Sequence, residues 1–109
     1  MDVMVQLEKY IVMVQAKQND YFKRMNFTFA DPDTVTADIG RKYARVVKNN
    51  DTQRSVHTFV NLKNGDILKS GGWSAPQKNG VRGNIFADDL GADRVNEHGA
   101  NYIKGPQFV

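Results

Sequence analysis

The chain has 109 residues, of which 40% are hydrophobic and 25% charged, and a formal net charge of +3. This length fits a single domain, 1–109, and the composition is that of a folded chain. The lack of cysteine excludes disulfides, thiolate metal sites and thiol nucleophiles. No apolar run approaches the roughly 20 residues of a membrane span, and MDVMVQLEKY is not a secretory signal. We therefore expect a cytoplasmic protein without a membrane partner.

The positive charge is concentrated in the middle of the chain. Residues 41–82 contain nine Lys or Arg and two Asp or Glu, a net charge of +7. Residues 1–40 and residues 83–109 each carry a net charge of −2. Such a block favours an acidic partner. The alternative is that one face of a sheet is rich in Lys and Arg for solubility.

The first 25 residues have the pattern of an amphipathic helix. Met4, Leu7, Ile11 and Val14 recur at helical spacing, and no Gly or Pro interrupts the run. Three further apolar residues widen the stripe beyond one face: Val5, Val12 and Met13. A stripe this wide predicts a deeply buried helix or a helix that contacts a second chain. A homo-oligomer formed through this helix is therefore one expectation.

Residues 26–73 are predicted to form an antiparallel sheet. Segments 41–48 and 55–62 are rich in β-branched and aromatic residues, and the turn-forming sequence NNDTQR separates them. Asn64-Gly65 predicts a two-residue hairpin turn, which would pair Leu62 with Ile67. We therefore expect a meander of three or four strands.

The alternation within these strands predicts two different faces. One face is apolar and is expected to contain Ala44, Val46, Val56, Val60, Leu62 and Ile67. The opposite face is expected to contain Arg41, Tyr43, Arg45, Val47, His57, Phe59 and Leu68. Either the helix and the C-terminal segment cover both faces, or the second face is an exposed aromatic and basic platform. Bases stack on platforms of this kind while cations contact the phosphates.

The segment GGWSAPQKNGVRGNIF, residues 71–86, predicts a glycine-rich loop that contains the only tryptophan of the chain. It matches neither the GxxxxGK[ST] nor the GxGxxG phosphate-binding pattern. Trp73 is interpreted either as a packing anchor at the edge of the core or as part of an anion site with Lys78 and Arg82. Short helical turns are expected after this loop.

Residues suited to catalysis are scarce. His57 and His98 are the only histidines, and neither lies in a recognisable metal-binding or nucleophile motif. We therefore expect a protein that is not an enzyme and that needs no metal or cofactor.

Five blocks occur in order between Gly40 and Phe86: GRKYARVV, SVHTFVN, NGDILKSGGW, SAPQK and VRGNIF. This series resembles a family of small, mostly uncharacterised bacteriophage proteins. The resemblance covers less than half of the chain and carries over no functional residue. It implies a phage-encoded protein that acts in the cytoplasm of the infected host.

The expected architecture is α+β, with an N-terminal helix (1–25) packed on a small antiparallel meander (26–73), then a Gly-rich loop and short helices (74–109). The expected function is binding of nucleic acid through the basic middle segment. The candidate residues are cationic or aromatic: Arg41, Tyr43, Arg45, His57, Phe59, Trp73, Lys78 and Arg82. Two alternatives stay open: a protein–protein module that binds and modulates a host factor, and a binder of anionic small ligands such as nucleotides.

Overall fold

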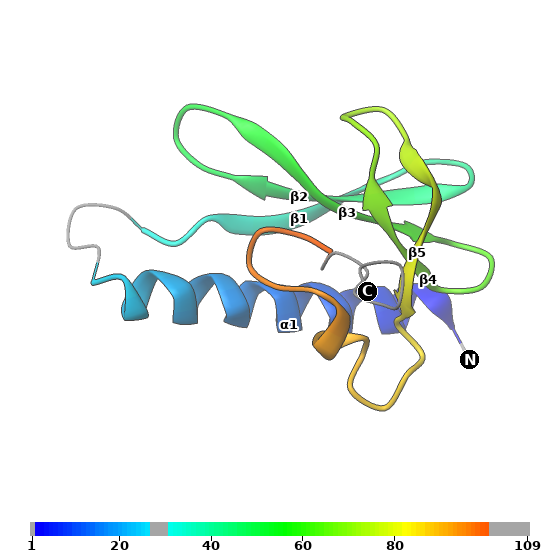
Figure 1. Cartoon of the computed structure of the whole chain (residues 1–109), viewed down its shortest axis with the longest axis horizontal. Coiled ribbons are helices and arrows are strands. Elements are labelled where there is room, and N and C mark those ends of the chain that lie inside the picture. Colours follow the sequence, from blue (N-terminus) through cyan, green and yellow to red (C-terminus); the bar gives the residue numbers. More distant parts are fainter. Residues whose placement is uncertain (1, 27–30, 101–109) are drawn as a thin grey trace, which may run out of the picture.

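The computed structural model describes residues 2–26 and 31–100, apart from the side chains at positions 78 and 79. It contains α1 (Val3–Arg24), β1 (Thr34–Ile39), β2 (Tyr43–Asn49), β3 (Arg54–Asn61), β4 (Asp66–Ser70), β5 (Pro76–Asn84) and the 3-10 helix η1 (Ala92–Arg94). The strands form one antiparallel sheet in the order β1-β2-β3-β4-β5, and α1 lies along one of its faces (Figure 1). The predicted α+β class and N-terminal helix are confirmed. Residues 101–109, the end of the predicted C-terminal segment, lie outside the described residues.

The helix begins where the sequence provides a cap. Asp2 Oδ1 accepts a hydrogen bond of 2.8 Å from the backbone N–H of Met4, which satisfies one of the free amides of the first turn. Lys23 and Arg24 occupy the last turn, where cations interact favourably with the negative end of the helix dipole. The core lies between α1 and the inner face of the sheet, and we use "inner face" for the side that α1 covers. The buried core residues are Leu7, Tyr10, Val14, Val35, Ala44, Val46, Val60, Ile67, Ile85 and Val95.

Glutamines of α1 bind backbone groups of the edge strand β1 and of the segment after β5. Gln6 donates a 3.0 Å hydrogen bond to the backbone oxygen of Ile85, and Gln18 donates to the backbone oxygen of Glu97. The side-chain oxygen of Gln15 accepts a 2.8 Å hydrogen bond from the backbone N–H of Val35. These contacts fix the entry to β1 and the C-terminal segment against the helix, because buried backbone groups require a partner.

The predicted register of the β3–β4 hairpin is wrong by two residues. Val60 pairs with Ile67 rather than Leu62 with Ile67, and four residues, 62–65, connect the strands. A two-residue type I′ turn requires a positive φ at both central positions, but Gly65 has φ +82° and Asn64 is not among the residues with positive φ. The side chain of Asn61 instead accepts a 2.8 Å hydrogen bond from the N–H of Lys63. A slip of two residues leaves every side chain on its predicted face.

The sheet has one strand more than the upper predicted number, because β5 occupies much of the predicted glycine-rich loop. Its proline, Pro76, stands at the first position of an edge strand, where a missing N–H is tolerated. At Gly80, an added Cβ would lie 2.6 Å from the oxygen of Gln77 and 3.2 Å from that of Lys69. The glycine therefore permits a close approach of backbones within a strand. After β5, the only helical element in the described residues is η1, a single short turn.

A β-bulge in β3 reverses the faces of its first half. Val46 pairs with Thr58, but Val47 pairs with Val56, so His57 is the extra residue. The prediction that His57 shares a face with Phe59 is therefore wrong. His57 points to the inner face, where it is 2% exposed and its ring lies 6.5 Å from the ring of Tyr10.

His57 belongs to a buried chain of hydrogen bonds. Its Nε2 lies 2.7 Å from the backbone oxygen of Asn96 and must donate, because a carbonyl only accepts. Its Nδ1 lies 2.9 Å from Thr58 Oγ1, which lies 2.7 Å from the hydroxyl of Tyr10. In the neutral imidazole, Nδ1 accepts from Thr58, and Thr58 accepts from Tyr10. The chain thus joins α1, β3 and the C-terminal segment.

Burial lowers the pKa of His57 from 6.5 to about 4, although the hydrogen bond to Asn96 acts in the opposite direction. As the pH falls from 6.5 towards 4, the unfolded chain therefore takes up a proton before the folded chain does. We predict that the free energy of unfolding at pH ~5 is about 2 kcal/mol lower than at pH ~7.5 because of this residue. Urea denaturation across this pH range measures the effect.

The matched control uses the other histidine. His57→Gln should remove most of the loss between pH ~6.5 and ~5, a window above the ordinary carboxyl pKa, whereas His98→Gln should retain it. An equal pH dependence in wild type and His57→Gln would contradict this role of His57.

Candidate functional site

The outer face of the sheet, opposite α1, carries a cluster of one tryptophan, two arginines and one aspartate. The guanidinium carbons of Arg45 and Arg54 lie 4.4 Å and 5.4 Å from the centroid of the Trp73 ring. Asp38 Oδ2 lies 3.1 Å from Arg45 Nη1, and its Oδ1 lies 3.0 Å from Arg54 Nη2. We call these four residues the Trp73 cluster.

Strand pairing and one loop assemble this cluster. Asp38 is the β1 partner of Arg45 on β2, so their side chains lie on one face. Asn49, at the end of β2, pairs with Arg54, and its Oδ1 accepts a 2.9 Å hydrogen bond from Arg54 Nε. The β4–β5 loop crosses β3, because Arg45 Nε donates a 2.8 Å hydrogen bond to the backbone oxygen of Trp73.

Asp38 neutralises part of the cationic charge of the cluster. Burial opposes ionisation of this carboxyl, but hydrogen bonds from Arg54 and Arg45 outweigh it and hold the pKa of Asp38 below its usual range. The carboxylate is therefore charged at neutral pH and orients both guanidinium groups. Trp73 nevertheless stays 42% exposed. It is a surface side chain held by cations and not an anchor of the core.

A small hollow of about 240 Å³ adjoins the Trp73 cluster at the β1–β2 turn. Arg41 and Lys42 are exposed in this turn, and the ammonium of Lys42 lies 5.4 Å from the centroid of the Tyr43 ring. Tyr43 meets Phe59 edge to face, with ring centroids 6.2 Å apart. Phe59 is only 3% exposed and forms the floor, whereas Tyr43 is half-buried.

The structure brings five of the predicted site residues to this one face: Arg41, Tyr43, Arg45, Phe59 and Trp73. His57 lies on the inner face and takes no part in this surface. The side chain of Lys78 lies outside the described residues. Asp38 and Arg54 belong to the site but were not predicted from the sequence. Only the strand register could have identified them, because Arg54 reaches the outer face through the bulge after Val56.

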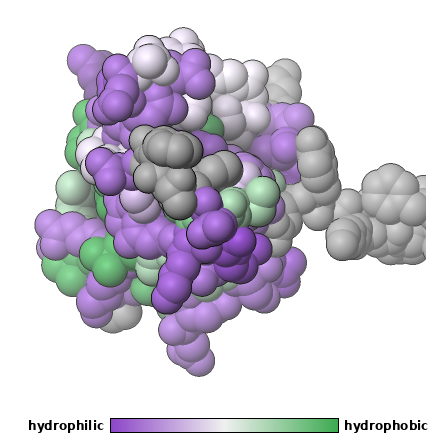
Figure 2. Space-filling model, turned by 90° about the vertical axis from the view of Figure 1, so that its left-hand side faces the viewer, coloured by the Kyte–Doolittle hydropathy of each residue, from purple (hydrophilic) through white to green (hydrophobic). Residues whose placement is uncertain are grey.

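Figure 2 shows the end of the molecule at which α1 stops and β2 turns into β3, and most of the surface visible there is polar. None of the helices in the described part of the chain is both long and apolar enough to cross a membrane. Among residues 2–26 and 31–100, no group of three or more metal-ligating side chains stands in a position to hold a metal ion.

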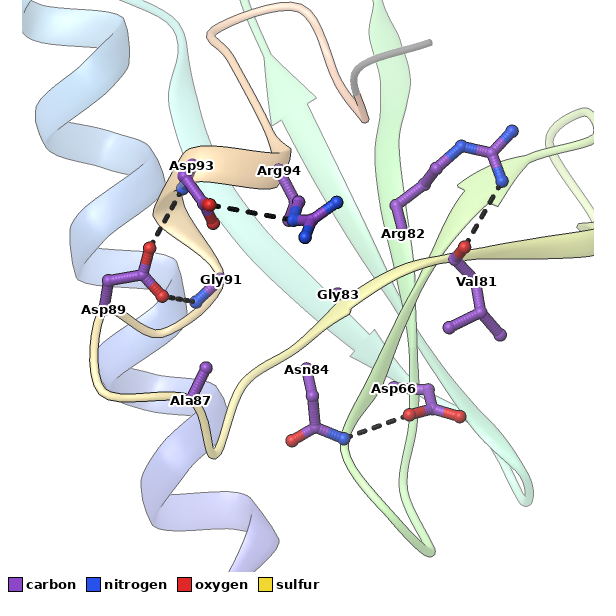
Figure 3. A pocket seen from close by; sticks show the side chains of 10 residues that line it. All are labelled: Asp66, Val81, Arg82, Gly83, Asn84, Ala87, Asp89, Gly91, Asp93 and Arg94. Carbon is purple, nitrogen blue, oxygen red and sulfur yellow. Dashed lines mark hydrogen bonds and ion pairs between the residues drawn. The ribbon is translucent and has the colours of Figure 1, made fainter. Parts of the chain in front are cut away.

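Arg82 lines a second, larger hollow of about 590 Å³ between β5 and the segment around η1 (Figure 3). This hollow contains Arg94 as well as three carboxylates, which belong to Asp66, Asp89 and Asp93. Those carboxylates have internal partners. Asp89 accepts hydrogen bonds from the N–H groups of Gly91 and Asp93, at 2.9 Å and 3.2 Å, and Asp66 accepts one of 3.0 Å from Asn84. The hollow is therefore a poor site for a polyanion.

The fold and the outer face together define a small α+β domain with one long helix on one side of its sheet and a cationic, aromatic surface on the other. The chain belongs to a family of unknown function (DUF7717), whose model matches residues 1–102. No curated protein and no solved structure matches the chain significantly. Membership of an uncharacterised family is thus confirmed, and a bacteriophage origin stays a prediction.

Arg45 connects the loop to the sheet and is the residue with which this geometry can be tested. We predict that Arg45→Ala lowers the free energy of unfolding by about 1 kcal/mol, because it removes a cation–π contact and a hydrogen bond. The same change should make Trp73 more accessible to acrylamide, which quenches the fluorescence of the single tryptophan. Arg82→Ala is the control, and equal quenching in both variants would show that Arg45 does not hold the loop.

Proposed function

We propose that this protein is a non-enzymatic binding module that takes up single-stranded nucleic acid on the outer face of its sheet. The observation that carries the proposal is the Trp73 cluster. Two guanidinium groups fix the indole, yet two-fifths of the side chain remains open to solvent. An immobilised, accessible aromatic ring is a stacking site for an unpaired base, at about 1–3 kcal/mol per base.

The charge around Trp73 suits a phosphate backbone. Four cations surround the ring and the neighbouring hollow, namely Arg41, Lys42, Arg45 and Arg54, against one carboxylate, Asp38. They follow β2, whose seven residues span roughly 20 Å at ~3.3 Å per residue. A surface of this length accommodates a few nucleotides of a single strand, with Trp73 beside its middle.

A free nucleotide is a less suitable ligand for this surface. The hollow beside Tyr43 has a volume of about 240 Å³, which is below the ~300–1,000 Å³ of typical small-molecule pockets. Its shallow, open shape fits one part of a longer chain better than a ligand that must be enclosed. Thermal shifts with a nucleotide panel test this alternative, because a bound ligand raises the stability of the folded state.

We also propose where this protein comes from and where it acts. The five sequence blocks between Gly40 and Phe86 support a phage-encoded protein that works in the cytoplasm of its bacterial host. These blocks contain most of the outer face, including the β1–β2 turn and the β4–β5 loop. A pull-down from bacterial lysate, with and without nuclease, tests the alternative that a host protein is the partner. Capture of one specific protein that survives nuclease treatment would favour that alternative.

The central test measures fluorescence anisotropy with labelled single-stranded and duplex oligonucleotides of about 10 nucleotides. We predict tighter binding of the single strand and an affinity that falls with salt. Trp73→Ala should weaken binding by about 5- to 150-fold, the loss of one stacked base. Exchanging both Arg41 and Lys42 for Ala should reduce the slope of log affinity against log salt by about 1.4, since each phosphate contact contributes ~0.7.

Arg82→Ala is the matched control, because Arg82 is a cation of the same basic segment but lines the hollow with three carboxylates. It should change the affinity by less than about twofold, as expected for a cation away from the contact surface. Lack of binding to every oligonucleotide at low salt would refute the proposal. Equal affinities of wild type and Trp73→Ala would refute the stacking site.

A further inference from the structure

Arg45 and Arg54 use part of their hydrogen-bonding capacity within the protein. Arg45 donates from Nε to the backbone oxygen of Trp73 and from Nη1 to Asp38. Arg54 donates from Nε to Asn49 and from Nη2 to both carboxylate oxygens of Asp38, at 3.0 Å and 3.1 Å. Each guanidinium group thus directs its Nε and one terminal nitrogen to a protein acceptor, and only the other donors remain for a ligand.

Asp38 also keeps these two cations close together. Its Oδ2 lies 3.1 Å from Arg45 Nη1 and 3.1 Å from Arg54 Nη2. The two nitrogens therefore lie within about 6 Å of each other, and the carboxylate between them offsets the repulsion of like charges at that distance. With Asp38 ionised, the two arginines and the aspartate carry a net charge of +1 beside the exposed Trp73 ring. The carboxylate thus lowers the attraction of this part of the surface for phosphates.

Arg41 and Lys42 differ from this pair of arginines. Both are exposed, and within residues 2–26 and 31–100 neither forms an ion pair with a carboxylate. A duplex offers phosphates to such cations but keeps its bases stacked inside the helix, whereas a single strand also offers bases to Trp73. The number of cations without a carboxylate partner therefore decides how well a duplex binds, and the indole ring adds affinity only for a single strand.

We propose that Asp38 makes the outer face select single strands over duplex nucleic acid, because it commits Arg45 and Arg54 to holding the Trp73 ring instead of contacting phosphates. This inference rests on the proposed function of the same face and adds the reason for its specificity. Both oxygens of Asp38 already accept hydrogen bonds from the arginines. Asp38 is therefore a positioning residue that acts through the two guanidinium groups.

The test is a titration of wild type, Asp38→Asn and Asp38→Glu with single-stranded and duplex oligonucleotides over a salt series. An amide has one acceptor oxygen in place of two, so Asp38→Asn releases at least one guanidinium group. This variant should bind the duplex about eightfold more tightly at ~0.1 M salt, with a slope of log affinity against log salt that is steeper by about 0.9, the value of one further phosphate contact.

The affinity of Asp38→Asn for the single strand should rise less than its affinity for the duplex. A single strand gains only ~0.7 in slope per phosphate contact, and a released arginine no longer fixes the ring on which a base stacks. The preference for the single strand should therefore fall. Asp38→Glu keeps a carboxylate and should retain most of this preference.

Asp20→Asn is the matched control, because Asp20 forms an ion pair of 2.9 Å with Arg24 on α1 and the substitution changes the net charge equally. It should change the affinity for the duplex by less than about twofold and leave the salt slope unaltered. A second pair of variants tests the same claim without altering Asp38. Arg54→Ala should reduce the salt slope for the duplex less than Arg41→Ala does.

The outcomes separate this inference from the proposed function. A wild-type protein that binds neither oligonucleotide at low salt would refute the proposed function itself. A wild type that prefers the single strand, together with an Asp38→Asn variant whose duplex affinity and salt slope equal those of wild type, would overturn the role of Asp38 alone. Equal losses of slope in Arg54→Ala and Arg41→Ala would overturn it as well.

Discussion

One long helix can cover only one face of a five-stranded sheet, and the rest of the described structure follows from this constraint. Tyr10 lies at the centre of the covered side, fully buried, with its hydroxyl hydrogen-bonded to Thr58. The apolar residues of α1 and the inner face supply the burial that stabilises this small domain. Glutamines of the helix and the neutral side chain of His57 then satisfy backbone groups of the edge strand β1 and of the segment after β5.

The uncovered face needs another solution, and its own strands and one loop provide it. Phe59 and Val47 are buried there although no helix lies above them. The β4–β5 loop crosses β3 and brings Trp73 to the two arginines, while Asp38 on β1 binds both guanidinium groups. Cations that would otherwise be mobile on the surface are thereby oriented around an aromatic ring. The same arrangement that shields this face also makes it suitable for an aromatic, anionic partner such as a single strand.

Much of this could be predicted from the sequence, and the errors have identifiable causes. The helix and the strands of the basic segment have strong periodicity, and a two-residue slip of the β3–β4 hairpin did not change any face. A single extra residue in β3 did change which face the side chains occupy. Because His57 bulges from β3, His57 moves to the inner face and Arg54 to the outer one. The β-bulge therefore explains why His57 was wrongly assigned to the site and why Arg54 was not predicted. Nothing in the local sequence RSVHTF predicts a bulge.

The strand β5 was not predicted from the sequence, for a different reason. Its proline and glycines are typical of loops, and only the neighbouring backbone shows why Gly80 must lack a side chain. Likewise, the exposure of Trp73 depends on contacts with residues 28 and 19 positions earlier in the chain. Such long-range contacts leave no periodic signal in the sequence. The sequence could therefore predict that the candidate surface is aromatic and basic, but not which residues form it.

The central claim is that the outer face is the binding surface, and amide chemical-shift mapping tests it most directly. A single-stranded oligonucleotide is added to isotope-labelled protein at low salt, and shifted amides are assigned. Shifts are expected in the β1–β2 turn, along β2 and in residues 71–75, with α1 and the segment around η1 unchanged. Shifts concentrated on α1 or around the hollow of Asp66 and Arg94, or none at saturating concentrations, would contradict it.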